Sequence, residues 1–178
     1  MAHAALPLLV GAGLGRDRIS RRLMVAGAFA AMLPDADVIG FAMGVPYDSA
    51  LGHRGFSHSL GAALLIGLLA VLAASWLKAG RIAAFLFVGL AFASHGLADM
   101  LTDGGHGVML FWPFDEARHF AGWRPIEVSP IGIERFLDRG AIAILASELK
   151  FLLLPAALVA LALRLFVPRP VDLAARRT

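Results

Sequence analysis

The sequence contains no cysteine among its 178 residues. Disulfide bonds, thiolate metal ligands and a cysteine nucleophile are therefore excluded. The G-x-S-x-G pattern of hydrolases with an activated serine is also absent. Any metal site must consequently be built from histidine, aspartate and glutamate side chains.

Charged residues are scarce as well. Asp, Glu, Lys and Arg make up 16% of the chain, hydrophobic residues make up 59%, and the mean hydropathy is +0.76. This composition lies outside the range of ordinary soluble domains and predicts an integral membrane protein. The length suits one compact unit, so we expect residues 1–178 to form a single integral membrane domain. The basic residues stand between apolar runs and are not interleaved with aromatic residues, which argues against nucleic-acid binding.

Five apolar runs predict the fold class, an all-α polytopic membrane bundle of about five spans. The runs cover approximately residues 3–15, 20–33, 59–77, 81–101 and 140–166. The second helix should end near Leu33, because the residue before a proline is disfavoured in the α region. Ser57 is a plausible N-cap for the third. From about Thr102 to Arg139 the sequence turns polar and rich in glycine and proline, and predicts a loop that caps the outer end of the bundle.

The basic residues predict the orientation of these spans. If the chain crosses five times, ten of its 16 Lys and Arg fall on one face, namely Arg16, Arg18, Arg21, Arg22, Lys78, Arg81, Arg164, Arg169, Arg176 and Arg177. Five fall on the other, namely Arg54, Arg118, Arg124, Arg135 and Arg139. By the positive-inside rule the first face is cytoplasmic, and the second, which carries most of the carboxylates, is extracytoplasmic.

Histidines and aspartates from distant parts of the sequence are expected at that same outer end. They are His3, Asp35, Asp37, His53, His58, His95 and Asp99. Ionisable groups within spans are costly, about 2.5–3.5 kcal/mol each on insertion scales. Because several such groups gather on one side, the sequence predicts a functional site there.

Each stretch also has a simpler interpretation when it is taken alone. His95 and Asp99 share one helical face, which suits a shared cation but also a hydrogen bond between packed helices. Asp35 and Asp37 are expected on a non-helical segment that aims both carboxylates inward, or else on a solvated turn. On a helix His53 and His58 would point about 140° apart, so they can share a site only if their segment is a loop; alternatively, this segment contacts lipid headgroups.

The combined donor set favours a divalent metal. Histidine nitrogens and carboxylate oxygens suit Zn²⁺, and less specifically Mn²⁺ or Fe²⁺. A catalytic zinc ion needs about three protein ligands and a water, so these residues suffice for one or two ions. Two ions about 3.5–4 Å apart could activate water and neutralise a developing oxyanion.

The motifs "LPDADV", "GHRGFSHSL", "SHGLADMLTDGG", "LFWPF" and "IGIERF" resemble the YdjM-like family of bacterial membrane proteins, described as predicted membrane-bound metal-dependent hydrolases. The resemblance covers roughly His3 to Arg139. It places the family pattern on His3, Asp35, Asp37, His53, Arg54, His58, His95, Asp99 and Glu134. Two positions depart from it, because Val38 stands where the family often has histidine and Asp103 where it often has proline.

Residues and resemblance together predict an enzyme of the bacterial inner (cytoplasmic) membrane, a metal-dependent hydrolase that acts at the outer surface on a lipid or lipid-linked phosphoester or ester. The expected metal ligands are His3, Asp35, Asp37, His53, His58, His95 and Asp99. Asp99, Asp35 or Glu134 would serve as general base if it is not a ligand, and Arg54 would pair with a phosphate. A non-enzymatic protein with a structural metal is an alternative. A transporter is disfavoured, because the inner halves of the spans are almost wholly apolar. The roles of His106, His119, Glu148 and Lys150 are left open.

Overall fold

The computed structural model describes residues 2–130, 132, 136–137 and 140–168. Every regular element in this part of the chain is helical, which confirms the all-α class. In chain order they are η1 (Ala2–Ala4), α1 (Ala5–Leu14), α2 (Arg21–Ala30), η2 (Leu33–Val38), α3 (Ile39–Ala42), η3 (Phe56–His58), α4 (Leu60–Leu72), α5 (Arg81–Asp99), α7 (Ala141–Glu148), the π-helical η4 (Leu149–Leu153) and α8 (Leu154–Phe166).

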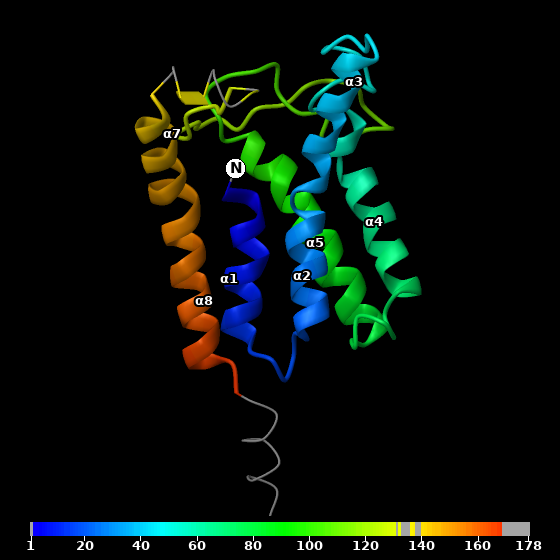
Figure 1. Ribbon diagram of the computed structural model, residues 1–178, viewed down its shortest axis with the longest axis vertical. Coiled ribbons are helices and arrows are strands. Elements are labelled where there is room, and N and C mark those ends of the chain that lie inside the picture. The colour runs from blue at the N-terminus through cyan, green and yellow to red at the C-terminus, as the bar shows by residue number, and fades with distance from the viewer. Residues whose placement is uncertain (1, 131, 133–135, 138–139, 169–178) are drawn as a thin grey trace, which may run out of the picture.

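The long helices lie side by side along the long axis of the molecule (Figure 1). Two are long and apolar enough to cross a membrane, α5 with 19 residues and the continuous helix Ala141–Phe166 with 26. Helix α2 and the η2–α3 segment form a third candidate, bent by 41° at their junction. The structure therefore shows two or three candidate spans rather than five, because Ala2–Leu14 and α4 are apolar but shorter than a full crossing of about 17–20 residues.

The surface and the interior of the bundle differ in the size of their apolar side chains. Large hydrophobic residues are widely exposed on the helices, among them Leu72, Ile82 and Phe166. Many of the buried residues between the helices are instead alanine or glycine, which let backbones approach closely. At Gly13, for example, a Cβ atom would lie 2.5 Å from the carbonyl oxygen of Ala160, so α1 and α8 touch at a position that only glycine fits. This is the pattern of a helical protein surrounded by lipid.

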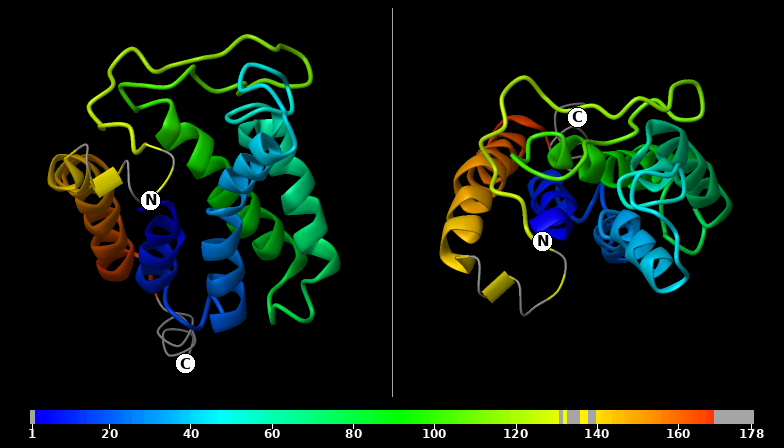
Figure 2. Two further views of the ribbon diagram at one scale, coloured as in Figure 1. Left: turned by 45° about the horizontal axis from the view of Figure 1, so that its top comes forward. Right: turned by 90° about the horizontal axis from the view of Figure 1, so that it is seen from above.

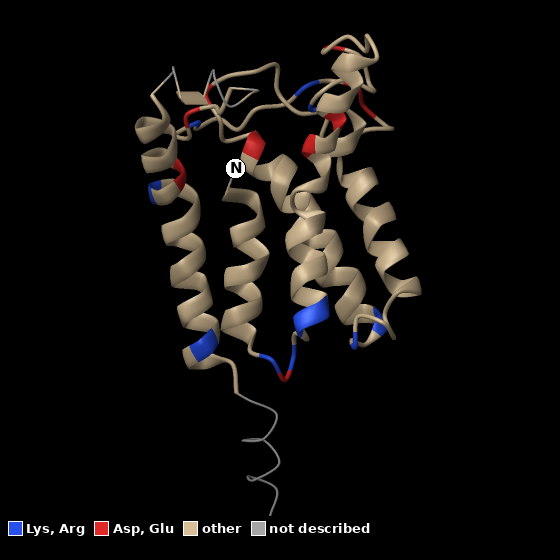
Figure 3. Ribbon diagram, in the orientation of Figure 1, with Lys and Arg blue, Asp and Glu red and all other residues tan. Residues whose placement is uncertain are grey.

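Charges separate towards the two ends of the bundle (Figure 3). We call the end that holds η1, η2, η3 and the C-terminus of α5 the polar end, because most of the carboxylates lie there. The α1–α2 turn and the α4–α5 turn lie at the opposite, basic end. The segment that follows α5 runs across the polar end (Figure 2), and backbone hydrogen bonds such as Met109 N–H to Arg54 O (3.0 Å) hold it there.

The second helix ends shortly before the proline, close to the predicted position, but the structure that follows it differs from the expectation. The α-helix ends at Ala30, and Pro34 is buried in the first turn of η2. A proline is tolerated there because the amide groups of a first helical turn have no partner within the helix. Asp35 and Asp37 therefore lie on a 3₁₀-helix and not on a non-helical segment.

The start of α4 also differs from the prediction. The N-cap is Ser59, whose Oγ accepts a hydrogen bond from the amide of Ala62 at 3.0 Å. Ser57 was expected in this role, but Phe56–His58 first forms the 3₁₀ turn η3, so the α-helix begins later. The Ser57 hydroxyl is instead directed to Asp37, at 2.6 Å.

Candidate metal centre

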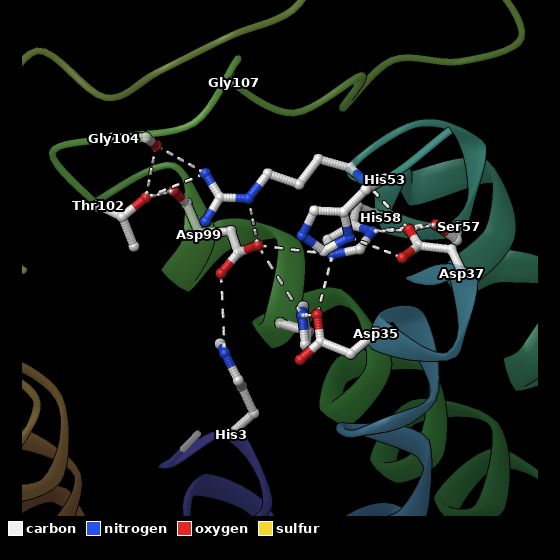
Figure 4. Close-up of polar contacts among 12 residues, drawn as sticks. His3, Asp35, Asp37, His53, Ser57, His58, Asp99, Thr102, Gly104 and Gly107 are labelled. Atoms are coloured by element: carbon white, nitrogen blue, oxygen red, sulfur yellow. Dashed lines mark hydrogen bonds and ion pairs between the residues drawn. The ribbon is translucent and has the colours of Figure 1, made fainter. Parts of the chain in front are cut away.

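Four short segments at the polar end bring the predicted site residues together (Figure 4). These segments are η1, η2, η3 with the loop that leads into it, and the last turns of α5. Two groups of side chains have donor atoms within 4.8 Å of one another: His3, His95 and Asp99 in one, and Asp35, His53 and His58 in the other. The predicted convergence of distant histidines and aspartates is thus what the fold produces.

Contacts between the two groups form a compact set of four donor atoms. His95 Nε2 lies 3.3 Å from Asp35 Oδ1 and 3.9 Å from Asp99 Oδ2. His58 Nε2 lies 3.8 Å from Asp35 Oδ1 and 3.5 Å from Asp99 Oδ2. Ligands about 2.0–2.1 Å from a tetrahedral zinc ion are separated by about 3.3–3.4 Å. The four donor atoms therefore have nearly the spacing of one coordination shell.

The two imidazole nitrogens of this set are buried, and within the described residues they have no hydrogen-bond partner. The side chains of His58 and His95 are both 0% exposed, and neither Nε2 atom has a hydrogen-bond partner in the described part of the protein. His95 Nδ1 donates a hydrogen bond to the carbonyl of Ala31 at 2.7 Å, which leaves Nε2 with its lone pair in the neutral ring. Buried polar atoms without partners are rare in native proteins, and two that converge on the same carboxylates fit a bound cation.

Asp37 lies behind the imidazoles and belongs to neither donor group. Its Oδ1 atom accepts a hydrogen bond from His53 Nδ1 at 2.7 Å. Its Oδ2 atom lies 3.2 Å from His58 Nδ1 and accepts hydrogen bonds from Ser57 Oγ and the amide of Arg54. In metal sites, carboxylates in this position fix the orientation and tautomer of the ligating histidines.

The electrostatics of the centre are visible at His58, which lies outside the membrane-spanning helices. Burial lowers the pKa of its imidazole, but the interaction with three nearby carboxylates outweighs burial and raises the pKa to about 10. These carboxylates belong to Asp35, Asp37 and Asp99. They create a negative potential that favours a positive charge at this position, either a proton or a metal ion.

His3 joins the centre from the start of the chain. Its Nε2 atom lies 3.7 Å from Asp99 Oδ1, and its ring stacks on that of His95 with the centroids 3.8 Å apart. The side chain is 12% exposed. The structure thus places His3 within reach of the same carboxylate as the other histidines.

Arg54 is buried and holds Asp99 in place. Its Nε atom lies 2.9 Å from Asp99 Oδ2, while Nη1 donates to Thr102 Oγ1 (3.1 Å) and to the carbonyl of Gly104 (2.9 Å). The backbone of Arg54 has φ 61°, a left-handed conformation that costs energy for a residue with a side chain. A strained position of this kind is a common feature of functional sites.

A cavity of about 350 Å³ opens beside the centre. His3, Asp35, His53, Arg54 and Asp99 line it on the side of the centre, and Glu127 and Glu148 are among its other lining residues. The Asp35 side chain is 50% exposed, so the centre has an accessible side. Glu148 was left unassigned from the sequence, although a buried charge within an apolar span was a signal for it. Glu134 lies outside the described residues.

The remaining histidines lie away from the centre. His106 pairs with Asp48, and His119 Nε2 lies 3.4 Å from Asp115 Oδ2. Arg118, which the sequence analysis placed only on the outer face, donates to the backbone carbonyls of His53 (3.1 Å) and Tyr47 (2.9 Å). It therefore fixes the loop that carries His53, a role with no sequence signal because its partners are backbone atoms.

An all-helical bundle with lipid-exposed apolar side chains and a buried histidine–aspartate centre defines a helical membrane protein with a potential metal site. The chain belongs to the YdjM inner membrane protein family, whose sequence profile matches residues 1–170. It is 43% identical over 160 residues to the inner membrane protein YbcI of Escherichia coli (strain K12), an alignment that covers 89% of this chain and 92% of that protein. No solved structure matches it. The family resemblance seen in the motifs is confirmed, and family and apolar helices together support an inner-membrane location.

Proposed function

We propose that this protein is a membrane-embedded, metal-dependent hydrolase that cleaves a lipid or lipid-linked phosphoester or ester. The observation that carries the proposal is the pair of buried Nε2 atoms of His58 and His95, which lie 3.3–3.9 Å from carboxylate oxygens of Asp35 and Asp99. Among the residues that the structure describes, neither atom has a hydrogen-bond partner. The cavity beside these atoms provides room for a substrate.

His58, His95, Asp35 and Asp99 would hold the first metal ion, and His3 and His53 are available for a second. Zinc suits this set of nitrogen and oxygen donors best, with manganese or iron as less specific matches. A bound divalent ion supplies Lewis acidity towards water and towards the negative charge that develops on a phosphoryl or acyl oxygen.

The protein's own side chains divide the remaining work. Asp37 and the carbonyl of Ala31 keep the Nδ1 atoms of the histidines protonated, so that the Nε2 atoms present lone pairs. The Arg54 guanidinium balances the charge of Asp99 and fixes its position. Asp35 is half exposed and faces the cavity. If the ion is held by the other three donors and water, Asp35 is therefore better placed than Asp99 to act as general base, because it can accept a proton from water there.

The proposed topology has five crossings, made by α1, α2–α3, α4, α5 and α7–α8. Helices α1 and α4 run beside the longer ones (Figure 1), so a bundle that spans the membrane carries them across a locally thinned bilayer. The basic end would face the cytoplasm and the polar end the outside. The centre would then lie at headgroup depth, where water enters from outside and a lipid enters sideways.

A structural metal site is the second candidate, because four protein donors suffice to close a tetrahedral shell. Two measurements separate the candidates: metal content by mass spectrometry, and a screen of lipid phosphoesters and esters with and without chelator. The hydrolase proposal expects bound metal and a turnover that chelator abolishes and metal restores. Stoichiometric metal without hydrolysis of any lipid in the screen would favour the structural site.

A further inference from the structure

An apolar groove of about 400 Å³ runs between α1 and α5, on the basic side of the metal centre. Val10 and Leu14 of α1 and Ala83 and Leu86 of α5 are among its walls. Ser94 is the one polar residue that lines it, and its hydroxyl is occupied by a hydrogen bond to the carbonyl of Ala91 at 2.7 Å. The groove therefore offers a ligand hydrocarbon contacts only.

The groove and the cavity at the centre lie on the same faces of the same two helices. His3, on the turn η1 that leads directly into α1, lines the cavity, while Leu6 and Val10 of α1, one and two turns further, line the groove. On α5, Ala98 lines the cavity, and Ser94 lines the groove one turn below it. The polar cavity and the apolar groove thus follow each other along the pair of helices α1 and α5.

The groove is also open to the bilayer, and its length along α5 is about the thickness of one leaflet. Leu86 and Leu90 line it and are 48% and 66% exposed, on the span that α5 forms. From Ser94 to Ala83 the helix rises about 16–17 Å at 1.5 Å per residue. The hydrocarbon core of a bilayer is about 30 Å thick, so a single leaflet contributes about half of that. A chain in this groove would lie parallel to its neighbours in the leaflet.

We infer that the groove binds a hydrocarbon chain of the lipid substrate, while the head of the same molecule lies in the cavity at the metal centre. This inference rests on the proposed function. The hydrocarbon chain of the lipid is already surrounded by other lipid chains before it binds, so its binding in the groove gains little free energy from desolvation. Its contribution is to position the headgroup, and this contribution grows with the length of chain that it contacts. Chain length thus becomes a property on which the enzyme selects.

Two neighbouring substitutions test this. Ala83→Trp fills the groove at its end farthest from the centre, whereas Ile82→Trp adds the same side chain at a position that is 77% exposed and does not line the groove. With phosphatidic acid as the probe, Ala83→Trp should lower turnover of the long-chain form roughly tenfold or more and leave the short-chain form unchanged. Ile82→Trp should leave both unchanged. Equal effects of the two variants, or equal loss for both chain lengths, would overturn the inference while leaving hydrolysis established.

A second measurement needs no turnover, so it decides on the groove even if no lipid is hydrolysed and the proposed function fails. The protein is placed in phosphatidylcholine vesicles with phosphatidic acid that carries a diazirine at the end of its chain. We expect photolabelling on the groove walls, competed by unlabelled phosphatidic acid, lost in Ala83→Trp and kept in Ile82→Trp. Labelling spread evenly over exposed side chains, or competed equally by added phosphatidylcholine, would show ordinary annular lipid and contradict a specific chain site.

Discussion

At the scale of single residues, the metal centre depends on what occupies the Nδ1 atoms of its histidines. A backbone carbonyl, that of Ala31, accepts from His95, and one carboxylate, Asp37, serves both His53 and His58. Because a single side chain orients two imidazoles, its loss should affect metal affinity more than the loss of any other residue outside the donor groups.

The substitution Asp37→Asn tests this role. Asparagine keeps the shape of the side chain, but it removes the negative charge and replaces one acceptor oxygen by a donor. We expect zinc affinity to fall about 10–100-fold, the usual consequence of losing such a partner, with the helical content unchanged. Competition with a chelating dye measures the affinity. Asp48→Asn, which alters the partner of His106 outside the centre, is the matched control and should bind zinc as the wild type does.

At the scale of elements, the centre requires the 3₁₀ turn η3 to approach α5 closely. A Cβ atom at Gly96 would lie 2.3 Å from the carbonyl oxygen of His58, far inside van der Waals contact. A glycine in the middle of a helix costs roughly 0.5–1 kcal/mol relative to alanine, so this position is held against helix propensity. The close approach places His58 and His95 against the same carboxylates.

Gly96→Ala should therefore push η3 away from α5 and weaken metal binding, while α5 itself stays helical. Gly89→Ala is the control on the same helix, because a Cβ atom there would come no closer than 3.4 Å to another residue. Zinc titration and circular dichroism of both variants give the comparison. Equal zinc affinity in the two proteins would mean that the contact of η3 with α5 does not set the geometry of the centre.

At the scale of the whole molecule, the sequence could predict the helical class and the residues that meet at the polar end. The helical class follows from the apolar runs and the charged segments between them. The residues at the polar end could be detected because burying His95 and Asp99 within an apolar helix costs free energy. The sequence could not show that Asp37 faces the Nδ1 atoms, that Ser59 caps α4, or that Arg118 binds backbone carbonyls. The contacts of Asp37 and Arg118 join segments that are distant in the sequence, and such contacts leave no periodic pattern in the chain. The cap of α4 is local, but it depends on Phe56–His58 forming a 3₁₀ turn first, which the sequence did not indicate.

The proposed orientation of the molecule can be tested with single cysteines, since the chain has none of its own. Asp48 and Asp17 are exposed at the polar and the basic end, respectively. A membrane-impermeant maleimide should label Asp48→Cys in intact cells or spheroplasts and Asp17→Cys only after permeabilisation, because the basic end is expected in the cytoplasm. The opposite labelling pattern would place the metal centre on the cytoplasmic side.

The decisive test of the proposed metal site is the metal content of the purified protein and of three single variants. His95→Ala and Asp99→Ala each remove one donor from the buried set, whereas His119→Ala changes a histidine outside it. We expect one or two divalent ions per chain in the wild type and in His119→Ala, and clearly less in the other two variants. A wild-type protein that binds no divalent metal, or unchanged metal content in both His95→Ala and Asp99→Ala, would contradict the proposed metal site.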